Sequence, residues 1–449
     1  MKSKERSSHT SSEHPSTKWR LSRKIGVIAA VFLIAGLGGY WTVYRAQFLR
    51  AERAFANGNL AKANHWFQKA SRWEWKKSHS TFGLARVASR EGDVDQAKRL
   101  LVVAENLGYS PAAIASQRNL LQLQSGAGIS PDTRIDPRKQ LTQAEVDRQQ
   151  AYIIGLSVLG NYEQAIEVAD AWIDQSLDRP EPYWLKAQLL SEHGDDKAAR
   201  PLFEQALAIN PDFLPAISGL ARTLNVLEQR SEAKLQYESV ISRLGDFVDL
   251  GDLSAVGADM LLQARLEKAK IQLDMGETDP VITDLEQLVQ EVPMNFATRF
   301  LLATEYAKQN KSGKIIEVIE PILPKFPDDI SLNYLMATAE SERGNLARST
   351  ELMDKYLNGR AQLDQLTRLE FEGRNQPPDP NLYTAIAQGY LRYKWDEAEP
   401  WLERALQLDP NSPVILAGIA EFYKKLGDQA QYRRYATAAQ RLAESGFRG

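Results

Sequence analysis

Apolar residues recur along this chain in pairs of short segments, each with the spacing of roughly 3.6 residues that marks one face of an α-helix. The clearest pair lies in residues 181–212. Gly194 separates its two apolar series, and Pro211 follows the second one. Because glycine favours the position after a helix and proline cannot continue one, the pattern predicts two short amphipathic helices joined by a tight turn at residues 193–195.

The same skeleton returns every 34 residues within three in-step series. Relative to Gly194, a small residue comes seven positions earlier, and apolar residues come five, nine and twelve positions later. The residues at the Gly194 place in the other copies are Gly58, Gly92, Gly160, Glu228, Gly276, Asn310, Gly344, Tyr393 and Gly427. The ninth and twelfth places are apolar in all ten copies, so the chain is predicted to consist of repeated helical hairpins.

Stacking of these hairpins follows from their composition. Alanine where the two helices cross lets them approach closely, while larger apolar residues bind each hairpin to the next. One hairpin alone cannot bury its apolar face, so the hairpins must pack in a row. A chain of 449 residues is also too long for one compact core, which favours an extended, all-α solenoid.

The small, aromatic and proline places at these offsets resemble the tetratricopeptide repeat superfamily, whose unit is a helix-turn-helix of the same length. The resemblance covers residues 45–447 at the level of fold. It implies an all-α, right-handed α-solenoid whose first helices line a concave surface.

The first 44 residues differ from the repeats. Residues 1–24 carry seven Lys or Arg against two Glu, which predicts a disordered basic tail. Residues 25–44 contain no charge and are long enough to cross a hydrocarbon core of roughly 30 Å, with Trp41 and Tyr44 at the far end, where interfacial aromatics belong. We expect an uncleaved N-terminal transmembrane helix. A signal peptide, cut after the small residues Gly36 and Gly38, is the alternative.

The short tail has the denser basic charge, so we place it in the cytoplasm and the repeats on the opposite, periplasmic or extracytoplasmic, side of the inner cell membrane. The pairs Gly26–Ala30 and Ala35–Gly39 have the small-residue spacing that would support a homodimer through the span.

Departures from the period predict where the solenoid is interrupted. Loop-forming residues replace the second helix of one repeat at 125–140, and extra residues occur at 245–253 and 359–378. The predicted repeat blocks are 45–124, 141–244, 254–358 and, with a C-terminal cap, 379–447. The second helix of the last hairpin has the polar face that a solvated cap requires, formed by Gln429, Gln431, Arg433, Arg434, Gln440 and Arg441.

The sequence offers little for catalysis. It has no cysteine, which excludes disulfides and thiolate metal sites, and it has no metalloprotease, phosphate-loop or serine-hydrolase motif. Carboxylate pairs such as Asp195-Asp196 and Asp328-Asp329 fall at turns, where helix capping explains them. We predict a protein that is not an enzyme and uses no metal or cofactor. The basic tail is too short and too poor in aromatics to predict nucleic-acid binding.

Recognition by the concave surface is the favoured alternative. In the superfamily, the residue ten before the turn position points into the groove, and here it is aromatic in six copies: Phe48, Phe82, Trp184, Phe300, Tyr334 and Tyr383. Four residues later come Glu52, Arg86, Gln188, Arg222, Lys270, Thr304, Thr338 and Glu421. An aromatic row beside polar residues predicts a groove for an extended protein or peptide ligand. Packing of the same aromatics between adjacent hairpins is the competing interpretation.

The lysine and asparagine of the clamp that binds chaperone C-termini are missing, because Phe82 and Arg86, or Trp184 and Gln188, occupy their places. One span followed by repeats is similar to bacterial envelope-biogenesis and assembly factors. That similarity implies a membrane-anchored, non-catalytic scaffold for assembly, secretion or envelope maintenance. A polysaccharide-handling accessory protein that uses the groove aromatics, and an uncharacterised enzyme, are the alternatives.

Overall fold

The computed structural model describes residues 41–73, 77–129, 142–248, 253–373, 378–426 and 429–446, and the regular structure within these ranges is entirely helical. The basic tail, most of the proposed span and its small-residue pairs lie outside the described residues. Within the described ranges, no helix combines the length and the apolar character needed to cross a membrane.

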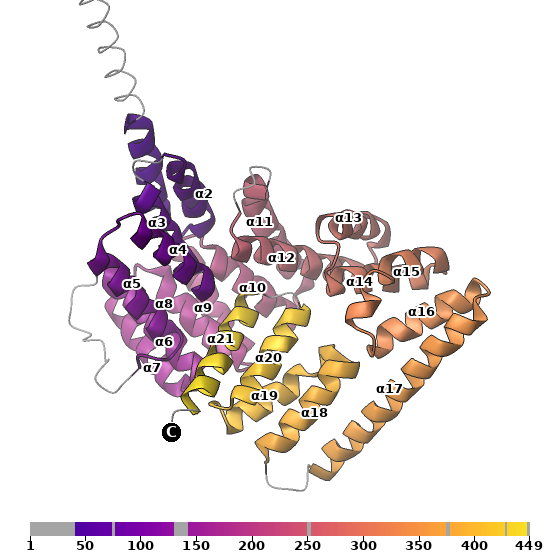
Figure 1. Cartoon of the computed structure of the whole chain (residues 1–449). Helices are drawn as coiled ribbons and strands as arrows, with labels where there is room; N and C mark the ends of the chain where they lie inside the picture. Colours follow the sequence, from indigo (N-terminus) through magenta and orange to yellow (C-terminus); the bar gives the residue numbers. More distant parts are fainter. Residues whose placement is uncertain are drawn as a thin grey trace, which may run out of the picture.

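The helices pair into successive hairpins (Figure 1). In chain order they are residues 41–56 with α2 (Leu60–Ser71), α3 (Lys77–Arg90) with α4 (Val94–Asn106), α5 (Pro111–Gln124), α6 (Gln143–Val158) with α7 (Tyr162–Gln175), α8 (Pro180–Glu192) with α9 (Asp196–Ile209), α10 (Leu214–Val226) with α11 (Arg230–Val248), α12 (Ala255–Asp274) with α13 (Thr278–Glu291), α14 (Phe296–Lys308) with α15 (Ser312–Ile319), α16 (Ile330–Glu342) with α17 (Leu346–Gly373), α18 (Pro380–Tyr393) with α19 (Glu399–Leu408), and α20 (Pro413–Leu426) with α21 (Gln429–Gly446). Short 3₁₀ turns, η3 (Leu323–Lys325) and η4 (Trp395–Glu397), follow α15 and α18.

The turn position of the repeat has a left-handed backbone. Gly194 has a φ of 77°, and the N–H of Asp195 donates to the carbonyl of Leu190 at 2.9 Å, which closes the end of α8. Glu228 and Asn310 occupy the same place with φ values of 59° and 56° although they are not glycines. Each accepts a strain of about 1 kcal/mol because the hairpin geometry requires this conformation. The repeat register predicted from the sequence is therefore confirmed at these turns.

Carboxylates at the turns act as helix caps, as the sequence predicted. Asp195 accepts a hydrogen bond from the backbone N–H of Ala198 at 3.1 Å, and Asp329 accepts one from Leu332 at 2.9 Å. These groups begin α9 and α16, so their conformation is explained without a catalytic role.

Packing between hairpins depends on a close approach of large and small residues. Phe203 of α9 is fully buried against Gly219 of α10, where an added Cβ would lie 2.4 Å from the ring. Phe67 of α2, in the first hairpin, makes the same contact with Gly83 of α3, in the second hairpin. A Cβ added at Gly83 would again lie 2.4 Å from the ring. Only a residue without a side chain leaves room for the phenyl ring, so these glycines set the spacing of the stack.

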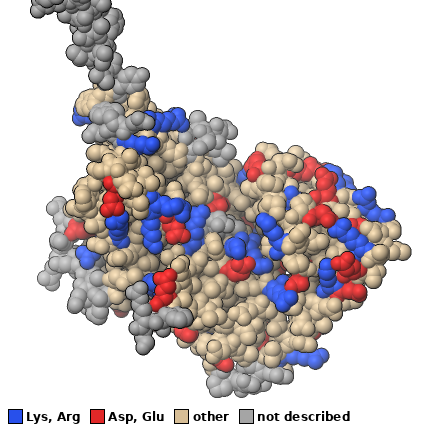
Figure 2. All heavy atoms as spheres, viewed as in Figure 1, with Lys and Arg blue, Asp and Glu red and all other residues tan. Residues whose placement is uncertain are grey.

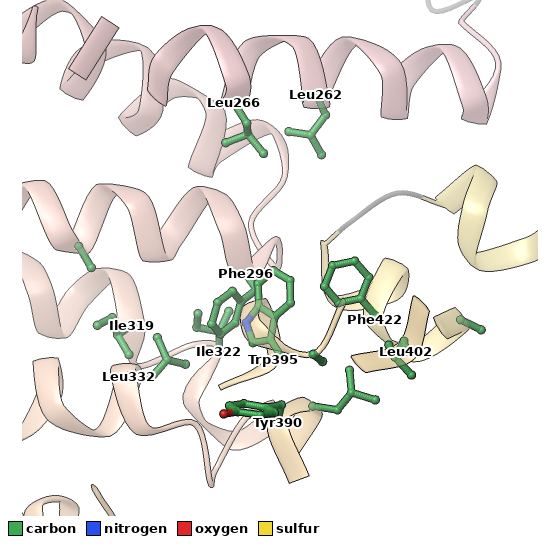
Figure 3. Packing of buried hydrophobic residues seen from close by; sticks show 14 of the residues in the cluster. Leu262, Leu266, Phe296, Ile319, Ile322, Leu332, Tyr390, Trp395, Leu402 and Phe422 are labelled. Atoms are coloured by element: carbon green, nitrogen blue, oxygen red, sulfur yellow. The ribbon is translucent and has the colours of Figure 1, made fainter. Parts of the chain in front are cut away.

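The core continues through the C-terminal half as one apolar cluster. Phe296 of α14 meets Trp395 with ring centroids 5.4 Å apart, and Trp395 meets Phe422 of α20 at 5.9 Å. Figure 3 shows these rings below Leu262 and Leu266 of α12. Aromatic packing thus joins the last hairpins to helices from the middle of the chain, in addition to the contacts that each hairpin makes with the next one in sequence.

The stack also curls back on itself. Figure 1 shows α21 beside helices of the N-terminal half, and α21 lies against α4, α6 and α12. Arg433 pairs with Asp93, and Arg434 donates to the Ser157 hydroxyl at 2.7 Å. We call the long-range polar contacts that join the N-terminal hairpins to α21 and to the start of α12 the closing seam; its residues are Glu91, Asp93, Ser157, Glu192, Ser254, Arg433 and Arg434.

The expectation of a solvated polar cap is therefore only partly met. Gln440 is exposed, but the side chains of Arg433 and Arg434 are only 22% and 18% exposed and point at the N-terminal hairpins. The physical reason is the curvature of the stack, which brings a second set of helices over the face that the local sequence marks as an end.

Candidate partner-binding surface

The predicted groove aromatics lie on first helices, and three of them pack against aromatic rings of their own or a neighbouring hairpin. Trp184 makes an edge contact with Phe213, with ring centroids 5.8 Å apart. Phe300 stacks on Phe296 at 5.7 Å, and Tyr383 lies 5.8 Å from Trp401. All three predicted groove residues are half-buried, so packing explains much of their aromatic character.

Tyr334 departs from this pattern. It is 47% exposed, and its ring lies 5.2 Å from that of Tyr356 on the following helix. Its neighbour on α16, Thr338, donates its hydroxyl to the carbonyl of Tyr334 at 2.9 Å. At this position the surface therefore presents a single exposed ring, that of Tyr334, and not the predicted row of aromatic residues.

The predicted polar residues bond with one another or with their own helices. Arg86 pairs with Glu52 at 2.9 Å, and Arg222 donates to Gln188 at 3.2 Å. Each of these pairs joins the same position in successive 34-residue repeats, so they form rungs between neighbouring hairpins. Lys270 and Thr304 bond within α12 and α14, to Glu267 and to the carbonyl of Phe300. A ligand on this surface therefore competes with internal partners.

Four aromatic rings form a continuous strip at the N-terminal hairpins. The centroid of His79 lies 6.5 Å from that of Phe48 and 5.2 Å from that of Tyr109, and Tyr109 stacks on Phe82 at 4.3 Å. All four side chains are half-buried, like the other predicted groove aromatics, but here the rings follow one another without a break. We call Phe48, His79, Phe82 and Tyr109 the aromatic strip.

Local structure explains how the strip is assembled. Phe48 and Phe82 occupy the same place in two successive first helices, so stacking of the hairpins brings them together. Tyr109 follows Gly108, whose φ of 78° turns the chain out of α4 and lays the phenol over Phe82. The sequence predicted Phe48 and Phe82 but missed His79 and Tyr109. The one sequence signal for Tyr109 is its place directly after Gly108, in the loop between two repeats.

An ion pair borders the strip. Arg86 is held by Glu52, and its guanidinium also lies 4.2 Å from the ring centroid of Phe55. Burial raises the pKa of the Tyr109 hydroxyl, and the nearby Arg86 charge opposes that rise. The phenol consequently remains a neutral hydrogen-bond donor at ordinary pH, next to one fixed cation and one fixed anion.

The C-terminal half holds a separate cavity of about 350 Å³ between α12, α14 and α20. Its lining includes Leu262, Phe296, Phe326 and Lys425, and it contains none of the predicted groove residues. Figure 3 shows Leu262 and Phe296 facing each other from α12 and α14. Within the described part of the chain, no cluster of His, Asp and Glu has the arrangement of a metal site.

Comparison with known proteins concerns the repeat. Residues 180–213 match the family model of the tetratricopeptide repeat. No curated protein matches the chain. The hairpin of α8 and α9 therefore matches a tetratricopeptide repeat, and the described residues as a whole form an all-α stack of hairpins similar to it.

Solved structures with similar helical repeats are all distant in sequence. YrrB, a tetratricopeptide repeat protein with an unusual peptide-binding site, is 16% identical, with 43% of this chain and 92% of that chain covered and a TM-score of 0.34. Yeast Tom70 is 13% identical, with 88% of each chain covered and a TM-score of 0.32. The human IFIT1 dimer with PPP-AAAA is 17% identical, with 81% and 90% covered and a TM-score of 0.34. At such scores these structures assign no partner and no process.

Proposed function

We propose that this protein is a non-catalytic scaffold that binds segments of partner proteins along the aromatic strip. The observation that carries the proposal is the strip itself, in which four partly exposed rings follow one another across the first two hairpins. Rigid rings bind apolar and proline-rich peptide side chains at a low entropic cost. The Arg86–Glu52 pair beside them supplies a donor and an acceptor for a peptide backbone.

The cellular setting is also a proposal. We infer that residues 25–44 anchor the chain in the inner cell membrane, with the tail in the cytoplasm and the repeats on the other side. The uncharged run of the sequence supports the anchor, and the described helix at residues 41–56 begins within the last part of that run. A scaffold in that position serves assembly, secretion or maintenance of the cell envelope.

Proximity labelling tests the strip. A labelling enzyme fused to the C-terminus of the full chain is compared between the parent and the Phe82→Ala/Tyr109→Ala variant. We expect the variant to lose a defined subset of labelled proteins, because both rings that stack at 4.3 Å are removed.

A matched control is Phe371→Ala, because Phe371 is 68% exposed on α17 and lies outside the strip. That variant is expected to keep the parental set. Equal labelled sets in the parent and in the strip variant, with both proteins folded by circular dichroism, would overturn the proposal.

A further inference from the structure

The first hairpin, residues 41–73, has an unusual charge balance. It carries six Lys or Arg and one carboxylate, Glu52, which is already paired with Arg86. On the view in Figure 2, Lys and Arg side chains without acidic neighbours surround the point where the chain enters its described part. The hairpin therefore presents an excess of positive charge at the N-terminal end of the stack.

Three of these cations lie on tryptophan rings, and none of the three is paired with a carboxylate among the described residues. The guanidinium of Arg45 is 5.0 Å from the ring centroid of Trp41, and that of Arg50 is 4.8 Å from Trp66. Lys69 approaches the same Trp66 ring at 5.2 Å. A guanidinium stacked by its face keeps the N–H groups of its edge available for an anionic oxygen.

Apolar side chains are exposed among these pairs. Trp41, Val43 and Leu49 are 44%, 46% and 53% exposed. Indole rings favour the level of the lipid headgroups, and each Lys or Arg near an anionic leaflet contributes roughly 1 kcal/mol of attraction. Exposed apolar groups, indoles and unpaired cations on one hairpin are the combination that an anionic bilayer surface binds.

The position of this hairpin in the chain selects the same ligand. The uncharged residues 25–40 precede the described residues in the sequence, and the basic hairpin begins directly after them with Trp41. We propose that the face formed by Trp41, Arg45, Leu49, Arg50, Trp66 and Lys69 lies on the surface of an anionic lipid bilayer. This contact, which rests on the proposed membrane anchor, fixes the solenoid at a defined orientation instead of leaving it on a loose tether.

A site-specific fluorophore tests the contact. The natural chain has no cysteine, so Leu49→Cys provides one labelling site on the proposed face, and Leu177→Cys provides a matched control at a residue that is 69% exposed in the α7–α8 turn. Full-length protein carrying a polarity-sensitive dye is mixed with phosphatidylcholine vesicles, with or without about one quarter phosphatidylglycerol. We expect a blue shift at position 49 with the anionic vesicles and none at position 177.

Neutralising two cations sharpens the test. Arg50→Gln/Lys69→Gln in the Leu49→Cys background is expected to weaken the response on the order of 30-fold in lipid concentration. No response at position 49, an equal response at position 177, or a response to single-stranded RNA in place of the anionic vesicles would overturn the inference.

Resistance to alkaline extraction reports the anchor separately. Protein that resists extraction without a blue shift at position 49 keeps the anchor and loses the surface contact. Protein that is extracted but still gives the lipid-dependent shift keeps the surface contact and loses the anchor. If both readouts are negative, both proposals fail.

Discussion

The two ends of the solenoid carry similar arginine-rich helices in opposite environments. In the last hairpin, Arg434 is mostly buried, donates to Ser157 and lies 3.5 Å from a carboxylate oxygen of Glu192. In the first hairpin, Arg50 is exposed and lies over Trp66. Within the described residues, Arg50 pairs with no carboxylate. The same residue type therefore closes the molecule at one end and remains available for an outside partner at the other.

The difference shows that local polarity does not decide what a terminal helix does. Curvature brings α21 over the N-terminal hairpins, where carboxylates and a hydroxyl are already in place. The first hairpin is also met by a distant helix, because α11 lies against α2, but that contact brings together the rings of His65 and Phe247 and not arginines with carboxylates. Testing this comparison means removing one arginine at each end and comparing the loss of stability.

The largest effect is expected from Arg434→Ala at the closing seam. The change removes the bond to Ser157 and leaves Glu192 partly buried without its cation, although Gln188 still donates to Glu192 at 2.9 Å. We expect the free energy of unfolding of the C-terminal hairpins to fall by about 3 kcal/mol. Chemical denaturation combined with amide hydrogen exchange in α21 measures this loss.

Gln440→Ala is the matched control on the same helix, because Gln440 is exposed and bonds only locally with Glu444. It is expected to change stability by less than about 0.5 kcal/mol. Equal exchange rates of α21 in the Arg434→Ala variant and the parent would show that the seam contributes nothing to closure.

The sequence predicted the parts of the fold that repeat. A period carried by alanine, apolar and turn positions specifies each hairpin locally, and it placed even Glu228 in the left-handed turn site. The closing seam could not be predicted in the same way. Arg433 and Asp93 are 340 residues apart and belong to no shared period, so only the accumulated rotation of the stack brings them together.

The candidate surface shows the same division. The repeat offset found Phe48 and Phe82, because they occupy equivalent helix positions. Tyr109 lies in an inter-repeat loop that the offset does not describe. Whether an equivalent position faces a ligand or a neighbouring hairpin depends on the next repeat, as the contact of Trp184 with Phe213 shows.

A smaller effect, dependent on pH, is expected at Glu91 in the seam. Burial, reinforced by the charge of Asp93, raises the pKa of the Glu91 carboxyl to about 7, although the Ser254 hydroxyl donates to it at 2.8 Å and opposes the rise. The folded protein thus binds more protons than the unfolded chain between about pH 4.5 and 7. The contribution of Glu91 to stability is therefore most favourable below that window and becomes less favourable as the pH rises through it.

Glu91→Gln removes this titration and keeps an acceptor for Ser254. We expect the variant to be more stable than the parent by roughly 2 kcal/mol near pH 8 and nearly equal to it near pH 4. Thermal unfolding at several pH values measures the difference between the two proteins. Buried Asp329 and the more exposed Glu403 also have raised pKa values, of about 6 and about 7, and their contribution cancels in that difference. Parallel stability curves would contradict the assignment of this dependence to Glu91.

The smallest effect on folding is expected at the other end, from Arg50→Ala. Arg50 is exposed, and its contact with Trp66 at 4.8 Å is a cation–π interaction in water, which contributes about 0.5 kcal/mol. Because its guanidinium neutralises no buried carboxylate, removing it leaves no unpaired buried charge in the fold. Chemical denaturation in the absence of lipid should therefore give nearly the same free energy of unfolding for the variant and the parent. The affinity of the variant for anionic vesicles, in contrast, should be lower than that of the parent. A loss of stability as large as that of Arg434→Ala would mean that the first hairpin, like the last, uses its arginines to hold the solenoid together.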